Sequence, residues 1–236
     1  MKRVIASLAL ACVLASGAAA QKDSKSWMEW SKKDAEKILN DSPWGQTQTQ
    51  TDTREMFYTP TAPGQGGARE TEGATNQATD IRYRIRFLTA RPIRQALARL
   101  ILLDNTGSDK ALEERMRSFA ESPPNDNIIV AVTYESKDGR RSGRALQAFS
   151  AATAATLKNT TYLQRKDGER LFLENYAPPG REGFGALFAF PRMVNGKPFV
   201  TPETGEVRFV STVGNGVELN MRFNVTKMIY NGALEY

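Results

Sequence analysis

Residues 80–103 read DIRYRIRFLTARPIRQALARLILL and contain two hydrophobic periodicities in succession. In the first eight residues, apolar positions alternate with three arginines: Ile81, Tyr83, Ile85 and Phe87 with Arg82, Arg84 and Arg86. A period of two predicts a half-buried strand with a cationic outer face. From Pro92, which suits the first turn of a helix, the apolar residues recur as on a wide helical face. A strand followed at once by a helix therefore opens the main domain.

Downstream of this stretch, helical patterns give way to strand patterns. We expect helices over 109–122 and 144–158, separated by a central apolar strand at 128–134. A hairpin with Asp167-Gly168 at its tip follows, and then come strands at 184–190, 197–200, 206–212, 217–225 and 227–234. The sequence thus predicts an α+β fold over 80–236, with helices in the first half and a mostly antiparallel sheet in the second.

Upstream, residues 21–44 predict an N-terminal amphipathic helix on a flexible linker. Ser26 and Glu29 have the spacing of a capping box, and Asn40 to Pro43 end the apolar periodicity. Residues 45–79 are rich in Thr, Gln, Gly and Pro and are typical of a linker. Residues 46–51, QTQTQT, alternate but are polar on both faces, so they predict an edge strand at best.

Residues 1–20 have the pattern of a signal peptide. Lys2 and Arg3 precede an apolar run, and Ala18 and Ala20 occupy the positions that signal peptidase requires. The apolar run is too short to span a membrane as a helix, which takes about 20 residues. We therefore expect an exported protein, periplasmic or secreted, with no transmembrane helix after cleavage.

The composition excludes several chemistries. The 236 residues include no histidine and one cysteine, Cys12, which lies in the predicted signal peptide. Catalysis through Ser-His-Asp or Cys-His groups, zinc sites of His and Cys, and disulfides are therefore absent from the mature chain. No catalytic residue, metal site or cofactor is predicted. A carboxylate-dependent hydrolase of envelope glycans or peptides stays as an alternative, with Glu135, Glu174 and Glu218 as example carboxylates.

Two clusters are candidate binding residues. The three tryptophans, Trp27, Trp30 and Trp44, form either an aromatic docking surface for a glycan or a partner protein, or anchors that pack the helix onto the sheet. The row Arg82, Arg84 and Arg86 either binds carboxylate or phosphate groups or is a solvated face paired with acidic neighbours.

The charge argues against nucleic acid as a partner. The net charge of +6 falls to +4 when Lys2 and Arg3 leave with the signal peptide, and the basic residues do not occur in blocks. The last residues alternate and end in Tyr236, as the final strands of outer-membrane barrels often do. A terminal strand in a soluble sheet explains the same alternation, and the barrel is kept as a further alternative.

Three stretches together resemble a family of exported bacterial proteins of acidobacterial type with no assigned function. They are WSKKDAEKIL at 30–39 with SPW at 42–44, RFLTARPIRQA at 86–96, and KMIY at 227–230 with LEY at 234–236. The resemblance implies that the N-terminal helix and the 86–96 corner belong to one module, and it transfers no catalytic residue. The function we expect is that of a non-enzymatic binding protein of the periplasm or envelope.

Overall fold

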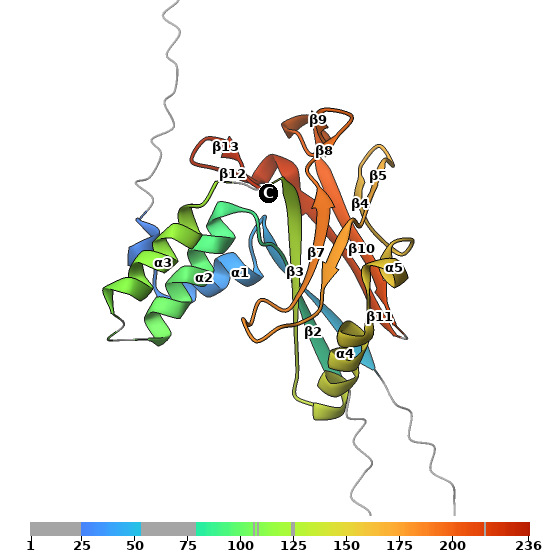
Figure 1. Cartoon of the computed structure of the whole chain (residues 1–236), viewed down its shortest axis with the longest axis horizontal. Helices are drawn as coiled ribbons and strands as arrows, with labels where there is room; N and C mark the ends of the chain where they lie inside the picture. The colour runs from blue at the N-terminus through green and yellow to red at the C-terminus, as the bar shows by residue number, and fades with distance from the viewer. Residues whose placement is uncertain (1–24, 53–78, 106, 108, 124–125, 215) are drawn as a thin grey trace, which may run out of the picture.

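A computed structural model describes residues 25–52, 79–105, 107, 109–123, 126–214 and 216–236, and it confirms the α+β class (Figure 1). The helices are η1 (Trp27–Glu29), α1 (Lys32–Asn40), α2 (Arg91–Asp104), α3 (Lys110–Glu121), α4 (Gly139–Ala151), α5 (Ala154–Leu157), η2 (Pro202–Thr204) and η3 (Val225–Lys227). The longer strands are β1 (Gly45–Asp52), β2 (Thr79–Phe87), β3 (Asn127–Ser136), β4 (Thr161–Arg165), β7 (Ala186–Pro191), β10 (Glu206–Val213) and β11 (Val217–Asn224). The shorter ones are β5 (Arg170–Phe172), β6 (Asn175–Ala177), β8 (Met193–Val194), β9 (Lys197–Pro198), β12 (Ile229–Tyr230) and β13 (Ala233–Leu234). The predicted signal peptide, 1–20, lies outside the described residues.

Two antiparallel sheets pack face to face. The first sheet has the strand order β1-β2-β3-β7-β6 and the second has the order β11-β10-β4-β5. Their inner faces are joined by edge-to-face aromatic pairs, with Phe87 against Phe223 at 4.8 Å and Phe188 against Phe209 at 5.3 Å between ring centroids. All four rings are almost fully buried. The alternation of apolar residues along each strand therefore produces a single core between the sheets.

Strand β1 corrects the predicted linker, because 45–52 are paired in the first sheet rather than free. Gly45 to Asp52 pair in full register with β2, and only 53–78 of the predicted linker lie outside the described residues. The glutamines that alternate with threonine in β1 form hydrogen bonds with residues far along the chain. The side chain of Gln48 donates to the carbonyl of Glu218 (2.7 Å) and accepts from the N–H of Asn220 (2.8 Å), and Gln50 donates to Glu218 as well. These glutamine side chains satisfy backbone groups on the edge of β11.

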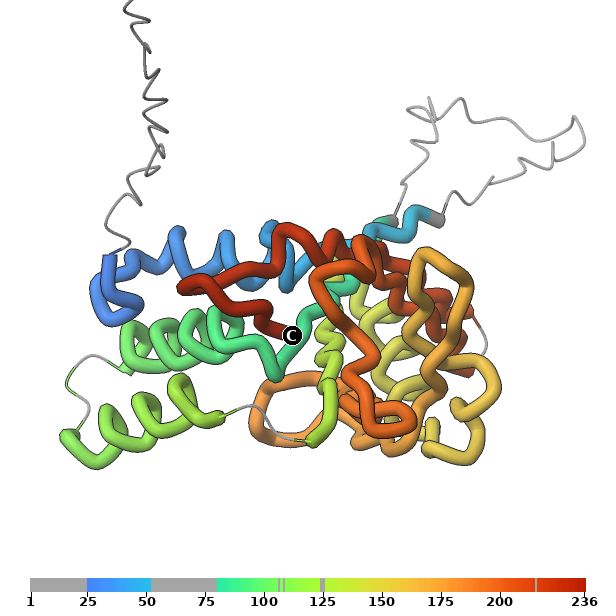
Figure 2. The backbone as a smooth tube through the Cα atoms, turned by 90° about the horizontal axis from the view of Figure 1, so that it is seen from above, coloured from blue at the N-terminus to red at the C-terminus, as the bar shows by residue number. Residues whose placement is uncertain are grey.

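The N-terminal helix packs directly on the main body, so the tethered helix of the prediction is wrong. Helices α1, α2 and α3 lie side by side at one end of the molecule (Figure 2), and α1 contacts both α2 and β2. The predicted cap is also displaced. Ser26 makes no side-chain cap and precedes only the short η1, whereas Ser31 and Asp34 form the capping box of α1. An Asp three residues after Ser provides the same reciprocal hydrogen bonds as Glu.

Two other boundaries differ from the prediction. The helix expected at 144–158 begins at Gly139, capped by Asp138, and breaks before Thr153, which caps the separate α5. The strand expected at 227–234 is a short hairpin, β12 and β13, preceded by η3. Asn231 at its tip has φ of +49°, a conformation that reverses the chain and interrupts the alternation.

The C-terminal residues fasten the hairpin to α2. Ala90, the N-cap of α2, has no side-chain oxygen, and Glu235 takes its place by accepting from the N–H of Arg91 (3.1 Å). The same carboxylate is 3.2 Å from the Arg91 guanidinium, and its side chain is only 10% exposed. Burial lowers the pKa of Arg94 nearby, and the negative charge of Glu235 opposes that shift. Glu235 therefore stabilises both a helix N-terminus and a pair of arginines.

We expect Glu235→Gln to lower the free energy of unfolding by about 1–3 kcal/mol, because the amide retains an acceptor but removes the compensating charge. The loss is measured by urea denaturation. Glu218→Gln is the matched control, since that side chain is exposed and has no ion pair among the described residues. Equal stability of the two variants would contradict the role assigned to Glu235.

Candidate functional site

The three tryptophans that the sequence marked as candidate binding residues lie in the core. Trp27, Trp30 and Trp44 are 6%, 8% and 8% exposed. The indole N–H of Trp27 donates to Glu121 of α3 (3.3 Å), and that of Trp44 donates to the carbonyl of Glu235 (2.9 Å). Their arrangement is that of packing anchors, with each polar ring atom satisfied internally, and they form no exposed aromatic surface.

The three arginines of β2 point to one face of the sheet but have different surroundings. Arg82 is exposed, and Arg84 forms an ion pair with Glu135 of β3 at 2.5 Å. Arg86 is buried, so the row is not one anion site. The sequence analysis also allowed that these arginines form a solvated face paired with acidic neighbours. Of the three, only Arg84 has such an acidic partner among the described residues.

Arg86 binds the C-terminal end of α1. Its Nε donates to the carbonyl of Leu39 (2.9 Å), and its Nη atoms donate to Asn40 Oδ1 (2.9 Å) and Thr133 Oγ1 (3.2 Å). Burial, together with the charge of Arg84, lowers the pKa of Arg86 to about 10, so the guanidinium stays charged at neutral pH. The helix dipole places partial negative charge at this end, which compensates the buried cation.

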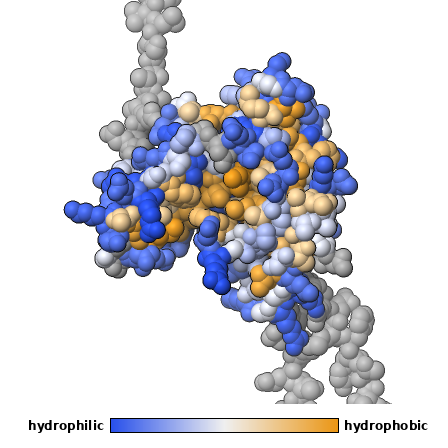
Figure 3. All heavy atoms as spheres, viewed as in Figure 1, coloured by the Kyte–Doolittle hydropathy of each residue, from blue (hydrophilic) through white to orange (hydrophobic). Residues whose placement is uncertain are grey.

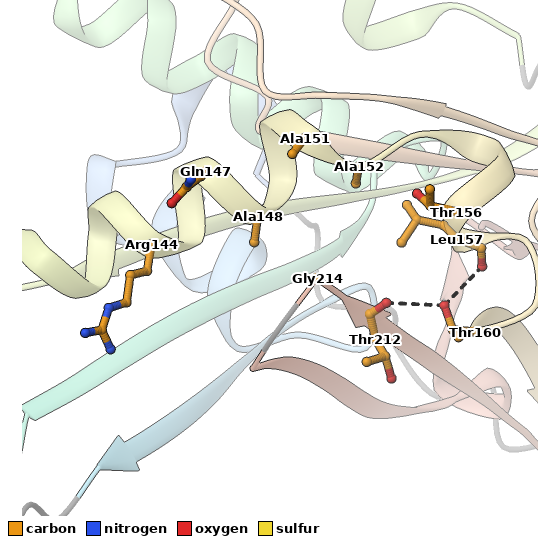
Figure 4. A pocket seen from close by; sticks show the side chains of 10 residues that line it. All are labelled: Arg144, Gln147, Ala148, Ala151, Ala152, Thr156, Leu157, Thr160, Thr212 and Gly214. Atoms are coloured by element: carbon orange, nitrogen blue, oxygen red, sulfur yellow. Dashed lines mark hydrogen bonds between the residues drawn. The ribbon is translucent and has the colours of Figure 1, made fainter.

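A cavity of about 640 Å³ lies where α4, α5 and the end of β10 meet (Figure 4). Its walls come from Arg144, Gln147, Ala148, Ala151, Ala152, Thr156, Leu157, Thr160, Thr212 and Gly214. The volume falls within the range of about 300–1,000 Å³ that is common for small-molecule sites. Of the described residues in its lining, Arg144 is the only one with a charged side chain.

Helix α4 positions one wall of this cavity. Arg144, Gln147, Ala148 and Ala151 are spaced three, four and seven residues apart and so form one stripe on the helix. The opposite side of α4 carries Phe149, which is fully buried. Its ring stacks on Tyr134 at 5.5 Å, and its carbonyl accepts a hydrogen bond of 2.6 Å from Tyr176. Burial raises the pKa of Tyr176, which keeps that hydroxyl a donor.

The floor depends on two small residues. A β-carbon at Gly214 would lie 3.4 Å from the Cβ of Ala148, so the strand end and the helix approach closely there. Gly214 has φ of +55°, which favours glycine. The hydroxyl of Thr160 lies 3.3 Å from the carbonyl of Leu157 and 3.2 Å from that of Thr212 (Figure 4). Its single proton serves these carbonyls, and its lone pairs remain available as acceptors.

The lining of the cavity combines hydrogen-bonding groups with apolar surface. Arg144 and Gln147 supply donors, Thr160 supplies an acceptor, and the alanines supply apolar surface. The hydroxyl of Thr156 is engaged with Thr153 in the capping box of α5. The example carboxylates Glu135, Glu174 and Glu218 are all exposed, and none of them lines the cavity. Within the described residues, no group of three or more Asp, Glu, His or Cys side chains is arranged to hold a metal ion.

A group of hydrophobic side chains outside the cavity is explained by packing within the protein. In Figure 3 hydrophobic side chains gather between the helices and the strands. Phe119 of α3 stacks on Phe184, which precedes β7, at 5.8 Å between centroids. Ile129 and Leu187 pack against the core as partly buried residues.

No known family, no curated protein and no solved structure matches the chain. The resemblance to exported acidobacterial-type proteins thus remains a prediction. Across the described part of the chain, no helix has both the length and the apolar character needed to cross a membrane.

The cavity was not predicted from the sequence. Its walls come from segments as distant as Arg144 and Gly214, and alanine and threonine have no distinctive chemistry. The available signal was the stripe of Arg144, Gln147, Ala148 and Ala151 within the segment 144–158, which was predicted only to be a helix.

Proposed function

We propose that the protein is an exported, non-enzymatic binding protein of the bacterial envelope, and that the cavity beside α4 holds a small acidic carbohydrate. The observation that supports the proposal is the guanidinium of Arg144 at the rim of a cavity lined otherwise by neutral groups. Arg144 is exposed, and it has no hydrogen bond or ion pair with another described residue. The signal-peptide pattern of 1–20 supports export.

An acidic sugar fits the lining group by group. Its carboxylate would accept charge-assisted hydrogen bonds from Arg144, the strongest class available to this cavity. Its hydroxyls would pair with the amide of Gln147 and with the hydroxyl oxygen of Thr160. The C–H surfaces of the ring would lie on Ala148 and on its small neighbours. A ligand without a carboxylate would leave Arg144 in water and lose specificity.

We expect Arg144→Ala to weaken the binding of galacturonate by about 10-fold to 100-fold, because a hydrogen bond to a charged group contributes about 1.5–3 kcal/mol. The measurement is an NMR titration of the purified protein with galacturonate and with neutral galactose. The wild-type protein is expected to bind the acid and to discriminate against the neutral sugar.

Arg140→Ala is the matched control, because Arg140 lies one turn earlier on α4, is exposed, and does not line the cavity. It removes the same charge and should leave galacturonate binding unchanged. An absence of binding by the wild-type protein, or equal weakening in the two variants, would refute the assignment of the cavity.

A further inference from the structure

The outer face of the second sheet continues from the rim of the cavity. Along β10, Arg208, Val210 and Thr212 face outward, and they alternate with buried residues. Thr212 lines the cavity. From Thr212 to Arg208 the strand advances by four residues, about 13 Å. A ligand longer than one sugar unit could therefore leave the cavity and extend along this face.

Two aromatic rings cross this face beside Val210. Tyr162 of β4 is opposite Val210, and Phe172 of β5 is opposite Tyr162. The two rings are 5.7 Å apart, and Phe172 is 44% exposed. The guanidinium carbon of Arg170 lies 4.5 Å from the centre of the Tyr162 ring. Tyr162 is half-buried beneath this guanidinium, whereas Phe172 is exposed, and an exposed aromatic ring suits the C–H side of a sugar ring.

A row of arginines lies two residues further along the same strands. Arg170, Arg208 and Arg222 all point outward on β5, β10 and β11. Arg222 is 3.8 Å from Glu206, whereas Arg170 and Arg208 have no acidic partner among the described residues. The other carboxylate of this face, Glu218, is at the cavity end. Two guanidinium groups therefore remain to complement carboxylates on a ligand.

We infer that this face extends the cavity into a site for an acidic oligosaccharide, an inference that rests on the proposed function. One sugar unit occupies the cavity beside Arg144. The following units lie on Phe172, and their carboxylates approach Arg170 and Arg208. On β5 an aromatic ring, Phe172, and a guanidinium, Arg170, lie two residues apart, and Arg208 lies in the same cross-strand row as Arg170, so an acidic glycan matches the face better than a neutral one.

The test compares galacturonate, tetragalacturonate and neutral maltotetraose as ligands of the full chain, by titration calorimetry. The tetramer is expected to bind at least about tenfold more tightly than the monomer, because its later units bind intramolecularly once the first is held. Phe172→Ala and Arg170→Ala should each remove this gain and leave monomer binding unchanged. Arg181→Ala removes a charge from an exposed loop position and should change neither affinity.

Three outcomes would separate the two proposals. Equal affinity for monomer and tetramer would overturn the extended site and leave the cavity assignment standing. Tetramer binding that depends on Arg170 but not on Arg144, without monomer binding, would overturn the cavity and support the sheet face. Tighter binding of single-stranded oligodeoxythymidine than of tetragalacturonate would overturn the choice of an acidic glycan. Circular dichroism shows whether Phe172→Ala folds. We expect this variant to fold, because the Phe172 side chain is exposed.

Discussion

Replacement of both Trp27 and Trp30 by alanine is expected to lower the free energy of unfolding by several kcal/mol, with about 3–5 kcal/mol for each ring taken alone. Both side chains are almost fully buried, and η1 packs on α2 through this segment. Arg99 of α2 donates to the carbonyl of Trp30 at 2.7 Å, so the loss of packing also weakens this hydrogen bond. Urea denaturation followed by circular dichroism measures the change.

Phe172→Ala is the matched control for the tryptophan variants, because it truncates an aromatic ring that is 44% exposed. Its cost should stay below about 1 kcal/mol, since little area returns to water. If Trp27→Ala and Trp30→Ala cost no more than this control, the rings are not held in the core. That result would restore the interpretation of the tryptophans as a docking surface.

The parts of the fold that the sequence predicts well are those in which local periodicity and burial agree. Over 80–103, the strand β2 and the helix α2 form where the two periodicities predict them. Burial follows the apolar pattern at Ile85 and Ile93, but Arg86, Arg94 and Gln95 are buried as well. The hairpin at Asp167-Gly168 is similar, because the turn residues and the flanking pattern give the same answer. In the hairpin, the neighbours in space are also near neighbours in sequence.

Strand β1 could not be predicted with the same ease, since its partner groups are far away along the chain. The alternation of QTQTQT allows an edge strand, and β1 is one, but no local feature decides between that strand and a solvated linker. Their role emerges only when Gln48 and Gln50 reach the backbone of Glu218 and Asn220, about 170 residues later. A polar strand is stable here because it completes the edge of another sheet.

The candidate binding residues show the same difference between what the local sequence predicts and what distant contacts decide. Arg82, Arg84 and Arg86 have one sequence pattern and three environments, because the end of α1 covers only Arg86. Residue type predicted that the tryptophans matter but not whether they face solvent. The cavity depends on small residues whose contribution is space, which a pattern of hydrophobicity does not record.

Arg86→Ala is expected to lower the free energy of unfolding by about 2–4 kcal/mol. Truncation removes the three hydrogen bonds that the guanidinium donates and leaves the carbonyl of Leu39 without its partner in a buried place. The end of α1 loses its compensating positive charge as well. Urea denaturation measures the loss, and native-state hydrogen exchange should show that α1 opens more readily than in the wild-type protein.

Arg84→Ala is the control, since Arg84 lies two residues away on the same face of β2 and carries the same charge. Its ion pair with Glu135 is largely exposed, so its removal should cost less than about 1 kcal/mol. The contrast between the two variants is decisive because composition, strand and face are shared and only the environment differs. If both variants lost the same small amount, the guanidinium of Arg86 would not hold α1, and the arginine row would again be a candidate for ligand binding.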